Sequence, residues 1–174
     1  MDNELLFSEE VRNMDELVDA LDNANKLSVL DRVKIGVICF LFDKDGRLIL
    51  NRRGPGARDD IGLLQALGGS VNGSDMDFRE AMMRELKEEG GLTPSNVQLD
   101  AFLGAYLDGK IDHHTGDFVN WIILGYRGTL VSGEVRNMEP DRCVGIEKYE
   151  LDKVPFTEVG TTATKFIKMM QENK

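Results

Sequence analysis

Cysteine is nearly missing from this chain, and so are long apolar runs. Among its 174 residues the only cysteines are Cys39 and Cys143, too few for the disulfide framework of a small secreted domain, so we expect two reduced core thiols. No segment approaches about 18 consecutive apolar residues, so no membrane-spanning helix is predicted. The first residues, MDNELLFSEEVRN, lack the basic start and apolar run of a signal peptide, which favours a cytoplasmic location.

An excess of basic residues is also missing. The chain has 31 Asp and Glu against 21 Lys and Arg, which gives a formal net charge of −10. A surface of this sign repels nucleic-acid backbones and anionic membranes, so we expect neither as a partner. It does not exclude a small anionic substrate, because bound cations reverse the local field.

Hydrophobic periodicity predicts one domain of mixed helices and strands after an N-terminal addition. We expect residues 1–31 to form a helical extension and residues 32–174 to form the main domain. Apolar and β-branched runs predict the strands, and amphipathic spacing predicts two helices in the main domain. The predicted strands cover 33–42, 47–53, 97–108, 118–130 and 143–151, and the predicted helices lie within 76–91 and 157–174.

The first of these two helices carries three clustered carboxylates, Glu85, Glu88 and Glu89. At 100° per residue the three side chains share an arc of about 100°. Like charges three and four residues apart each cost a few tenths of a kcal/mol, and the helix dipole disfavours anions in the last turn. Two interpretations stay open, namely a solvated acidic face and a site for a hard cation such as Mg²⁺ or Mn²⁺.

The spacing of these acids follows a defined pattern. The run RELKEEGGL, Arg84 to Leu92, reads Arg-Glu-aliphatic-x-Glu-Glu-x-Gly-aliphatic, and Gly68-Gly69 precede it. A chance match in a chain of this length is on the order of one in 10⁴. The run resembles the second half of the Nudix hydrolase signature. The resemblance covers about 33–155 and implies an α+β Nudix fold, in which a central mixed β-sheet is sandwiched between α-helices.

The first half of the signature departs from the family pattern. Six residues on from Gly69 stands Asp75 instead of Glu, and eight residues instead of seven separate Asp75 from Arg84. We therefore do not carry over to Asp75 the family's ion pair between the upstream acid and the Arg. We expect the helix to begin near Asp77, with Asp75 or Asp77 as its cap. The extra residue should bulge the loop outward and leave the three glutamates in place, because a longer loop costs little closure entropy.

The resemblance also implies a chemistry and a set of site residues. It implies cleavage of a diphosphate bond in a small-molecule nucleotide, with Mg²⁺ or Mn²⁺ as the cofactor. Arg84 would orient Glu85 by a hydrogen bond, and the general base stays open among Glu85, Glu88 and Glu139. The implied metal ligands are Gly68, through its carbonyl, Glu85, Glu88 and Glu89; the implied catalytic residues are Arg84, Glu85, Glu88 and Glu139.

Substrate and assembly stay open at this point. The segment at 137–155, NMEPDRCVGIEKYELDKVP, resembles part of the Nudix enzymes that act on nucleoside triphosphates, so cleavage to monophosphate and pyrophosphate leads. A pyrophosphatase acting on ADP-ribose, a sugar nucleotide or a dinucleotide is the alternative, and a non-catalytic nucleotide sensor is a third reading. The N-terminal helix leaves a homodimer possible. We expect His113 and His114 in a turn, and Phe118, Trp121 and Tyr126 in the core or, for one of them, stacked on a base.

Overall fold

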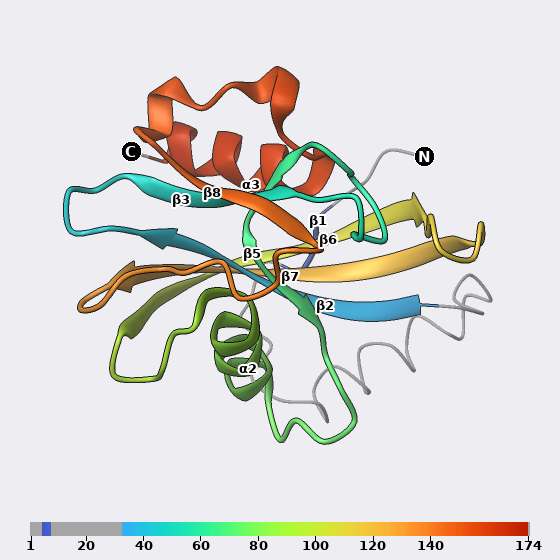
Figure 1. Ribbon diagram of the computed structural model, residues 1–174, viewed down its shortest axis with the longest axis horizontal. Coiled ribbons are helices and arrows are strands. Elements are labelled where there is room, and N and C mark those ends of the chain that lie inside the picture. The colour runs from blue at the N-terminus through green and yellow to red at the C-terminus, as the bar shows by residue number, and fades with distance from the viewer. Residues whose placement is uncertain (1–4, 8–32, 174) are drawn as a thin grey trace.

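The computed structural model describes residues 5–7 and 33–173, and in this part of the chain a mixed sheet lies between two helices (Figure 1). No described helix is long and apolar enough to cross a membrane. The elements in chain order are β1 (Leu5–Phe7), β2 (Val33–Phe42), β3 (Leu48–Arg53), β4 (Leu64–Gln65), β5 (Leu67–Ser70), α2 (Phe78–Gly90), β6 (Val97–Ile111), β7 (Phe118–Leu130), β8 (Cys143–Tyr149), the 3₁₀ turns η1 (Leu151–Lys153) and η2 (Phe156–Glu158), and α3 (Thr161–Glu172).

Strand β2 is the point at which the sheet divides. The strand order is β1-β6-β7-β2-β3-β4, with β5 paired to β2 and β8 paired to β3. Along one edge β2 runs parallel to β7 over its whole length. Along the other edge, Leu41 and Phe42 pair with β3, whereas the stretch from Gly36 to Cys39 pairs with β5. The backbone of β5 therefore lies beside the first half of β2.

The two faces of the sheet bury two separate cores, and the apolar run of β2 supplies both. Successive side chains of a strand point to opposite faces, so a strand covered on both sides is apolar throughout. Val37, Cys39 and Leu41 pack with α2, whereas Phe40 and Phe42 pack with α3. Figure 1 shows α2 and α3 on opposite sides of the sheet. The expected arrangement of a mixed sheet between helices is confirmed.

The sequence also led to one wrong assignment and one that stays untested. Phe118 is not in the core: it pairs with Ile111 at the far end of the β6–β7 hairpin, beyond the covering helices, and is 62% exposed. Tyr126, by contrast, is buried, and both cysteines are buried free thiols. Most of the predicted helical extension lies outside the described residues, and within it Leu5–Phe7 form the edge strand β1, paired with β6.

Candidate active site

Helix α2 starts and stops where its local sequence predicts. Asp77 is the N-cap, and its Oδ1 accepts a hydrogen bond of 2.7 Å from the N–H of Glu80. Gly91 ends the helix in the left-handed conformation, with φ +67°, which a residue without a Cβ adopts at little cost. Phe78, Met82 and other apolar residues of α2 are buried against the sheet. These caps and this buried stripe together fix the direction of the acidic side chains.

The glycine pair of β5 lies directly against two of those acids. The N–H of Gly68 donates a 2.8 Å hydrogen bond to Oε2 of Glu89. A Cβ on Gly69 would stand 2.5 Å from Oε2 of Glu85, and a Cβ on Gly68, with φ +147°, would overlap the backbone of β2. Both positions therefore require glycine, because the carboxylates and the β2 backbone occupy the space of a side chain.

Asp75 keeps the ion pair with Arg84, contrary to our expectation. Arg84 Nε donates to Asp75 Oδ1 at 3.0 Å, and Nη2 donates to Oδ2 at 3.1 Å. The Asp75 side chain is 3% exposed and also accepts a 2.7 Å hydrogen bond from the N–H of Asn72. Met76, the next residue of the longer loop, is 79% exposed. The shorter acid thus still reaches the arginine.

Arg84 also contacts two of the signature glutamates. Its Nη1 donates to Glu85 Oε1 at 2.6 Å and lies 3.3 Å from Oε2 of Glu88, while Nη2 donates to the carbonyl of Ser70 at 2.8 Å. The hydrogen bond by which Arg84 was predicted to orient Glu85 is therefore present. Arg84 ties together the loop, strand β5 and the acidic face of α2.

The acids of α2 differ in how deeply they are buried. Burial raises the pKa of Glu89 to about 8, although the hydrogen bond from the Gly68 N–H opposes the rise. Burial also raises the pKa of Glu85 above its usual value, against the hydrogen bond from Arg84. The negative charge of Glu139 contributes to both increases. Glu88 differs, since its side chain is 53% exposed. The two buried carboxylates thus lie in a setting where a cation would stabilise their charged form.

A groove of about 770 Å³ brings these acids together with residues from distant parts of the chain. Glu139, from the loop between β7 and β8, lines it and has Nη1 of Arg142 at 3.6 Å. Trp121 of β7 also lines it, with Lys34 Nζ 5.5 Å from the ring centroid. The other polar lining residues from outside α2 are Arg53, Arg58, Asp59, Gln65, Ser70, Asn72, Lys110 and Thr162.

The acids are oxygen donors of the kind Mg²⁺ and Mn²⁺ prefer, although their present partners are protein groups. Within 5–7 and 33–173, no three His, Cys, Asp or Glu side chains already stand together as a metal-binding group. Arg84 and the Gly68 N–H hold Glu85 and Glu89 instead. The donor set still fits a divalent cation, because two buried carboxylates with raised pKa values face the two glycines of β5, Gly68 and Gly69. The predicted set of metal ligands remains a prediction.

Sequence reasoning missed several polar residues around this groove. Asn51 of β3 is 3% exposed, its Oδ1 has no hydrogen-bond partner, and it shares a small side cavity with Glu89 and Glu139. The sequence feature that could have revealed Asn51 is its amide at a core-facing position of the strand LILNRR. Gln65 and Lys110 lie in the main groove, and nothing in their local sequence distinguishes them.

Comparison with known proteins identifies the family to which the chain belongs. The family model described as the NUDIX domain matches residues 32–170. The chain belongs to the Nudix family. The CTP pyrophosphohydrolase of Escherichia coli (strain K12) is 31% identical over 100 residues, which cover 58% of this chain and 70% of that protein. Membership and this relative together make the protein a Nudix pyrophosphohydrolase.

Solved structures of the Nudix family share the fold. The MutT protein from Methanosarcina mazei Go1 superposes with a TM-score of 0.68 at 22% identity, over 84% of this chain and 99% of that chain. The NUDIX domain of Shewanella oneidensis NrtR, complexed with ADP ribose, superposes with a TM-score of 0.63 at 16% identity, over 86% of this chain and 97% of that one. At these identities the likeness concerns the fold alone.

Proposed function

We propose that this Nudix protein hydrolyses a nucleoside triphosphate to a monophosphate and pyrophosphate, with Mg²⁺ or Mn²⁺. The observation that carries the proposal is the contact between the buried carboxylates of Glu85 and Glu89 and the glycine backbone of β5, at the wall of one large groove. An anionic substrate in an acidic groove requires positive charge, which a divalent cation and the lining arginines supply.

The acids of the proposed site divide two tasks, namely holding the cation and accepting a proton. Glu85, Glu88 and Glu89, with the Gly68 carbonyl, would hold the cation, which when bound offsets phosphate charge and acidifies water. Arg84 keeps Glu85 oriented through its hydrogen bond of 2.6 Å and does not itself hold the cation. Either Glu85, Glu88 or Glu139 takes the proton from the attacking water. Glu139 is the candidate outside α2, and its place in the groove supports including it.

Cationic side chains in the groove are positioned for the phosphates. Arg53 and Arg142 line it close to Glu89 and Glu139, since all four also line the small side cavity. Their guanidinium groups match phosphate oxygens in geometry and charge. They would hold the departing pyrophosphate while the acids of α2 position the attacking water.

A dinucleotide or sugar-nucleotide substrate is the second candidate. The volume of the groove, about 770 Å³, favours it, because such a space admits a substrate with a second large group. A non-catalytic sensor is less well supported than either enzyme. The variant first half of the signature motivated that reading, yet the Asp75–Arg84 ion pair is present at 3.0 Å.

A nucleotide screen with product identification tests the proposal. Triphosphates should yield pyrophosphate, whereas release of two monophosphates from linked nucleotides would establish the second candidate. Glu89→Gln should abolish turnover, and Glu134→Gln, at an exposed loop position, serves as the matched control. Binding of nucleotides without turnover of any of them would refute both enzyme proposals.

Thermal unfolding tests the cation site without catalysis. Cation binding to the folded protein stabilises it by about 2.7 kcal/mol at 100 times its Kd. Mg²⁺ should therefore raise the Tm of the wild type, and Glu89→Gln should remove most of that rise. An equal rise in both proteins would place the cation elsewhere.

A further inference from the structure

Asp60 stands out in the loop between β3 and β4. Among residues 5–7 and 33–173 it is the one non-glycine residue with positive φ, at +47°. That conformation is unfavourable for a non-glycine residue, although less so for Asp than for most. The contacts of its carboxylate offset the cost, because Asp60 Oδ2 accepts hydrogen bonds from both Gln65 Nε2 and Lys110 Nζ. Asp60 thus holds one side chain from β4 and one from β6.

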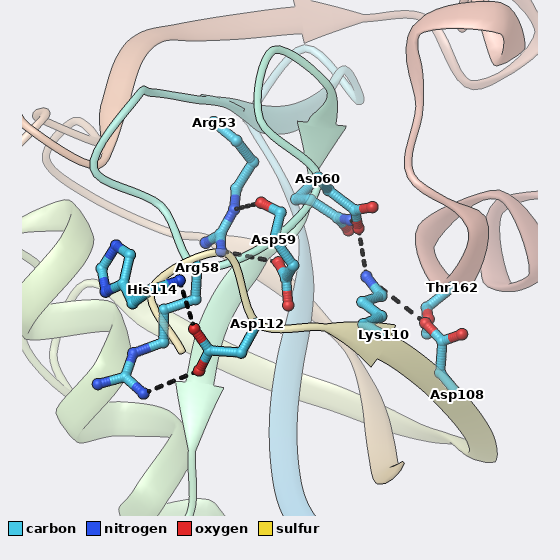
Figure 2. Close-up of polar contacts among 10 residues, drawn as sticks. Arg53, Arg58, Asp59, Asp60, Asp108, Lys110, Asp112, His114 and Thr162 are labelled. Atoms are coloured by element: carbon cyan, nitrogen blue, oxygen red, sulfur yellow. Dashed lines mark hydrogen bonds and ion pairs between the residues drawn. The ribbon is translucent and has the colours of Figure 1, made fainter. Parts of the chain in front are cut away.

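The surrounding backbone keeps space for this arrangement. Gly160, the N-cap of α3, lies against it, and a Cβ there would overlap Gln65 Nε2 and stand 2.8 Å from Asp60 Oδ2. On the other side of Lys110, Asp108 Oδ2 lies 3.5 Å from Nζ and accepts a hydrogen bond from the Thr162 hydroxyl. Figure 2 shows the Lys110 amine between the carboxylates of Asp60 and Asp108.

These contacts settle which atoms remain for a ligand. A carboxylate only accepts hydrogen bonds, so Asp60 engages the amide nitrogen of Gln65 and leaves the amide oxygen as an acceptor. Within the described residues, no group donates a hydrogen bond to that oxygen. Burial alone would lower the pKa of Lys110, but Asp60 and Asp59 raise it, so Lys110 is a charged donor.

Gln65 and Lys110 line the groove that also contains Glu85 and Glu89. Asp59 lines the same groove; its Oδ1 accepts from Arg53 at 2.9 Å, and its second oxygen is a further acceptor. Gln65 and Asp59 therefore add acceptor oxygens to the part of the groove in which Lys110 is a cationic donor. Gln65, Asp59 and Lys110 have no role in the proposed hydrolysis.

We propose that Gln65 and Lys110 read the base of the bound nucleotide and select a base with an exocyclic amino group, such as cytosine or adenine. Asp60 acts as the positioning residue that orients both. The proposal deepens the proposed function and depends on it only in that the groove binds a nucleotide. The amino group donates to the oxygen of Gln65, and the adjacent ring nitrogen accepts from Lys110.

The corresponding oxo base is disfavoured in the same pose. Uracil and hypoxanthine would place a carbonyl oxygen against the oxygen of Gln65 and a ring N–H against the ammonium of Lys110. A site built to hydrogen-bond one group rejects an analogue that leaves its buried polar groups unpaired. The free amide oxygen of Gln65 therefore favours a base that presents an N–H donor to it.

Equilibrium binding of the reaction-product nucleotides to the full-length protein tests this without hydrolysis. We compare Kd values for CMP against UMP and for AMP against IMP, since each pair differs only in amino against oxo. In at least one pair the amino nucleotide should bind tenfold tighter or more. Equal binding in both pairs, tighter binding of the oxo nucleotides, or no binding of any of the four would overturn the proposal.

Asp60→Asn tests the positioning role. Asparagine tolerates positive φ, and its amide both donates and accepts, so Gln65 is no longer held in one orientation. The amino-to-oxo ratio of Kd values should fall to about threefold or less, and Asp60→Glu should restore part of it. Asp100→Asn, at an exposed position, should leave the ratio unchanged. A ratio unaffected by Asp60→Asn would refute the role, and global destabilisation does not change a ratio measured on one protein.

The two proposals fail separately. Base discrimination without turnover of any triphosphate would leave this inference standing and refute the proposed hydrolysis. Turnover of triphosphates without discrimination between CMP and UMP or between AMP and IMP would do the reverse.

Discussion

Asp75→Asn removes the charge that faces Arg84 and should destabilise the fold measurably. The Asp75 carboxylate accepts hydrogen bonds from Arg84 Nε at 3.0 Å, from Arg84 Nη2 at 3.1 Å and from the N–H of Asn72 at 2.7 Å. An asparagine keeps one acceptor oxygen, and its amide nitrogen is a donor that faces other donors. The variant therefore loses about half of these contacts as well as the charge.

The size of the loss follows from burial and from the remaining partners of Arg84. Breaking a buried ion pair by removing one member costs about 3–5 kcal/mol. Arg84 keeps its hydrogen bonds to Glu85 and to the Ser70 carbonyl, so we expect a smaller loss than this, about 2–3 kcal/mol of unfolding free energy. For a chain of this length that corresponds to a fall in Tm of about 5–10 °C.

Chemical denaturation and a nearby control measure this effect. Asp77→Asn makes the same substitution two residues along the chain, where asparagine caps a helix as well as aspartate does, so its unfolding free energy should stay within about 0.5 kcal/mol. Turnover of Asp75→Asn should fall less than that of Glu85→Gln, because the acids stay on α2. A loss below about 0.5 kcal/mol in Asp75→Asn would show that the ion pair does not brace the loop.

The difference in unfolding free energy between wild type and Asp75→Asn should depend on pH in a definite direction. The hydrogen bond from Arg84 lowers the pKa of Asp75 below its usual value, although burial opposes the change. A carboxyl with a lowered folded-state pKa stabilises the protein above the unfolded-state value and loses that contribution as the pH falls through the folded-state value. The gap between wild type and Asp75→Asn should therefore be full at pH 7 and shrink below about pH 4.

Three further substitutions test the site and the fold. Gly69→Ala forces a methyl group to 2.5 Å from the Glu85 carboxylate, so the rate of nucleotide hydrolysis should fall about a hundredfold or more. Gly145→Ala is the control: a Cβ there has nothing within 4 Å, so the rate should not change. Asp43→Asn should cost about 1–2 kcal/mol at pH 7 in denaturant unfolding, because hydrogen bonds from Arg47 outweigh burial and lower the pKa of Asp43 to about 2. That cost should vanish as the pH falls from about 4 towards 2, and a pH-independent cost would refute it.

The boundaries of α2 and the two-sided burial of β2 follow from local sequence. A helix cap bonds to backbone groups of the adjacent turn, so Asp77 and Gly91 can be predicted as caps from their immediate neighbours. The alternation along β2 depends only on strand geometry. Both features are therefore fixed by residues close together in the chain.

The first half of the signature shows where this local reasoning fails. Counting residues from Asp75 to Arg84 indicated a lost ion pair, because a shorter acid and an extra residue change reach and direction. The structure keeps the ion pair, and the neighbouring Met76 is 79% exposed. Loop backbones adjust at little cost, so a count along the sequence does not decide which side chains meet.

The Nudix signature, the spacing of Glu85, Glu88 and Glu89 on one helical face, and the succession of strands and helices can all be read from the chain without coordinates. The folded structure is needed to show that Glu139 and Lys110 share a groove with those acids and that Gly69 must lack a side chain. The reason is physical: the spacing on a helix is set by its own geometry, whereas the neighbours of a groove residue depend on which distant strands pair, here β2 with both β5 and β7.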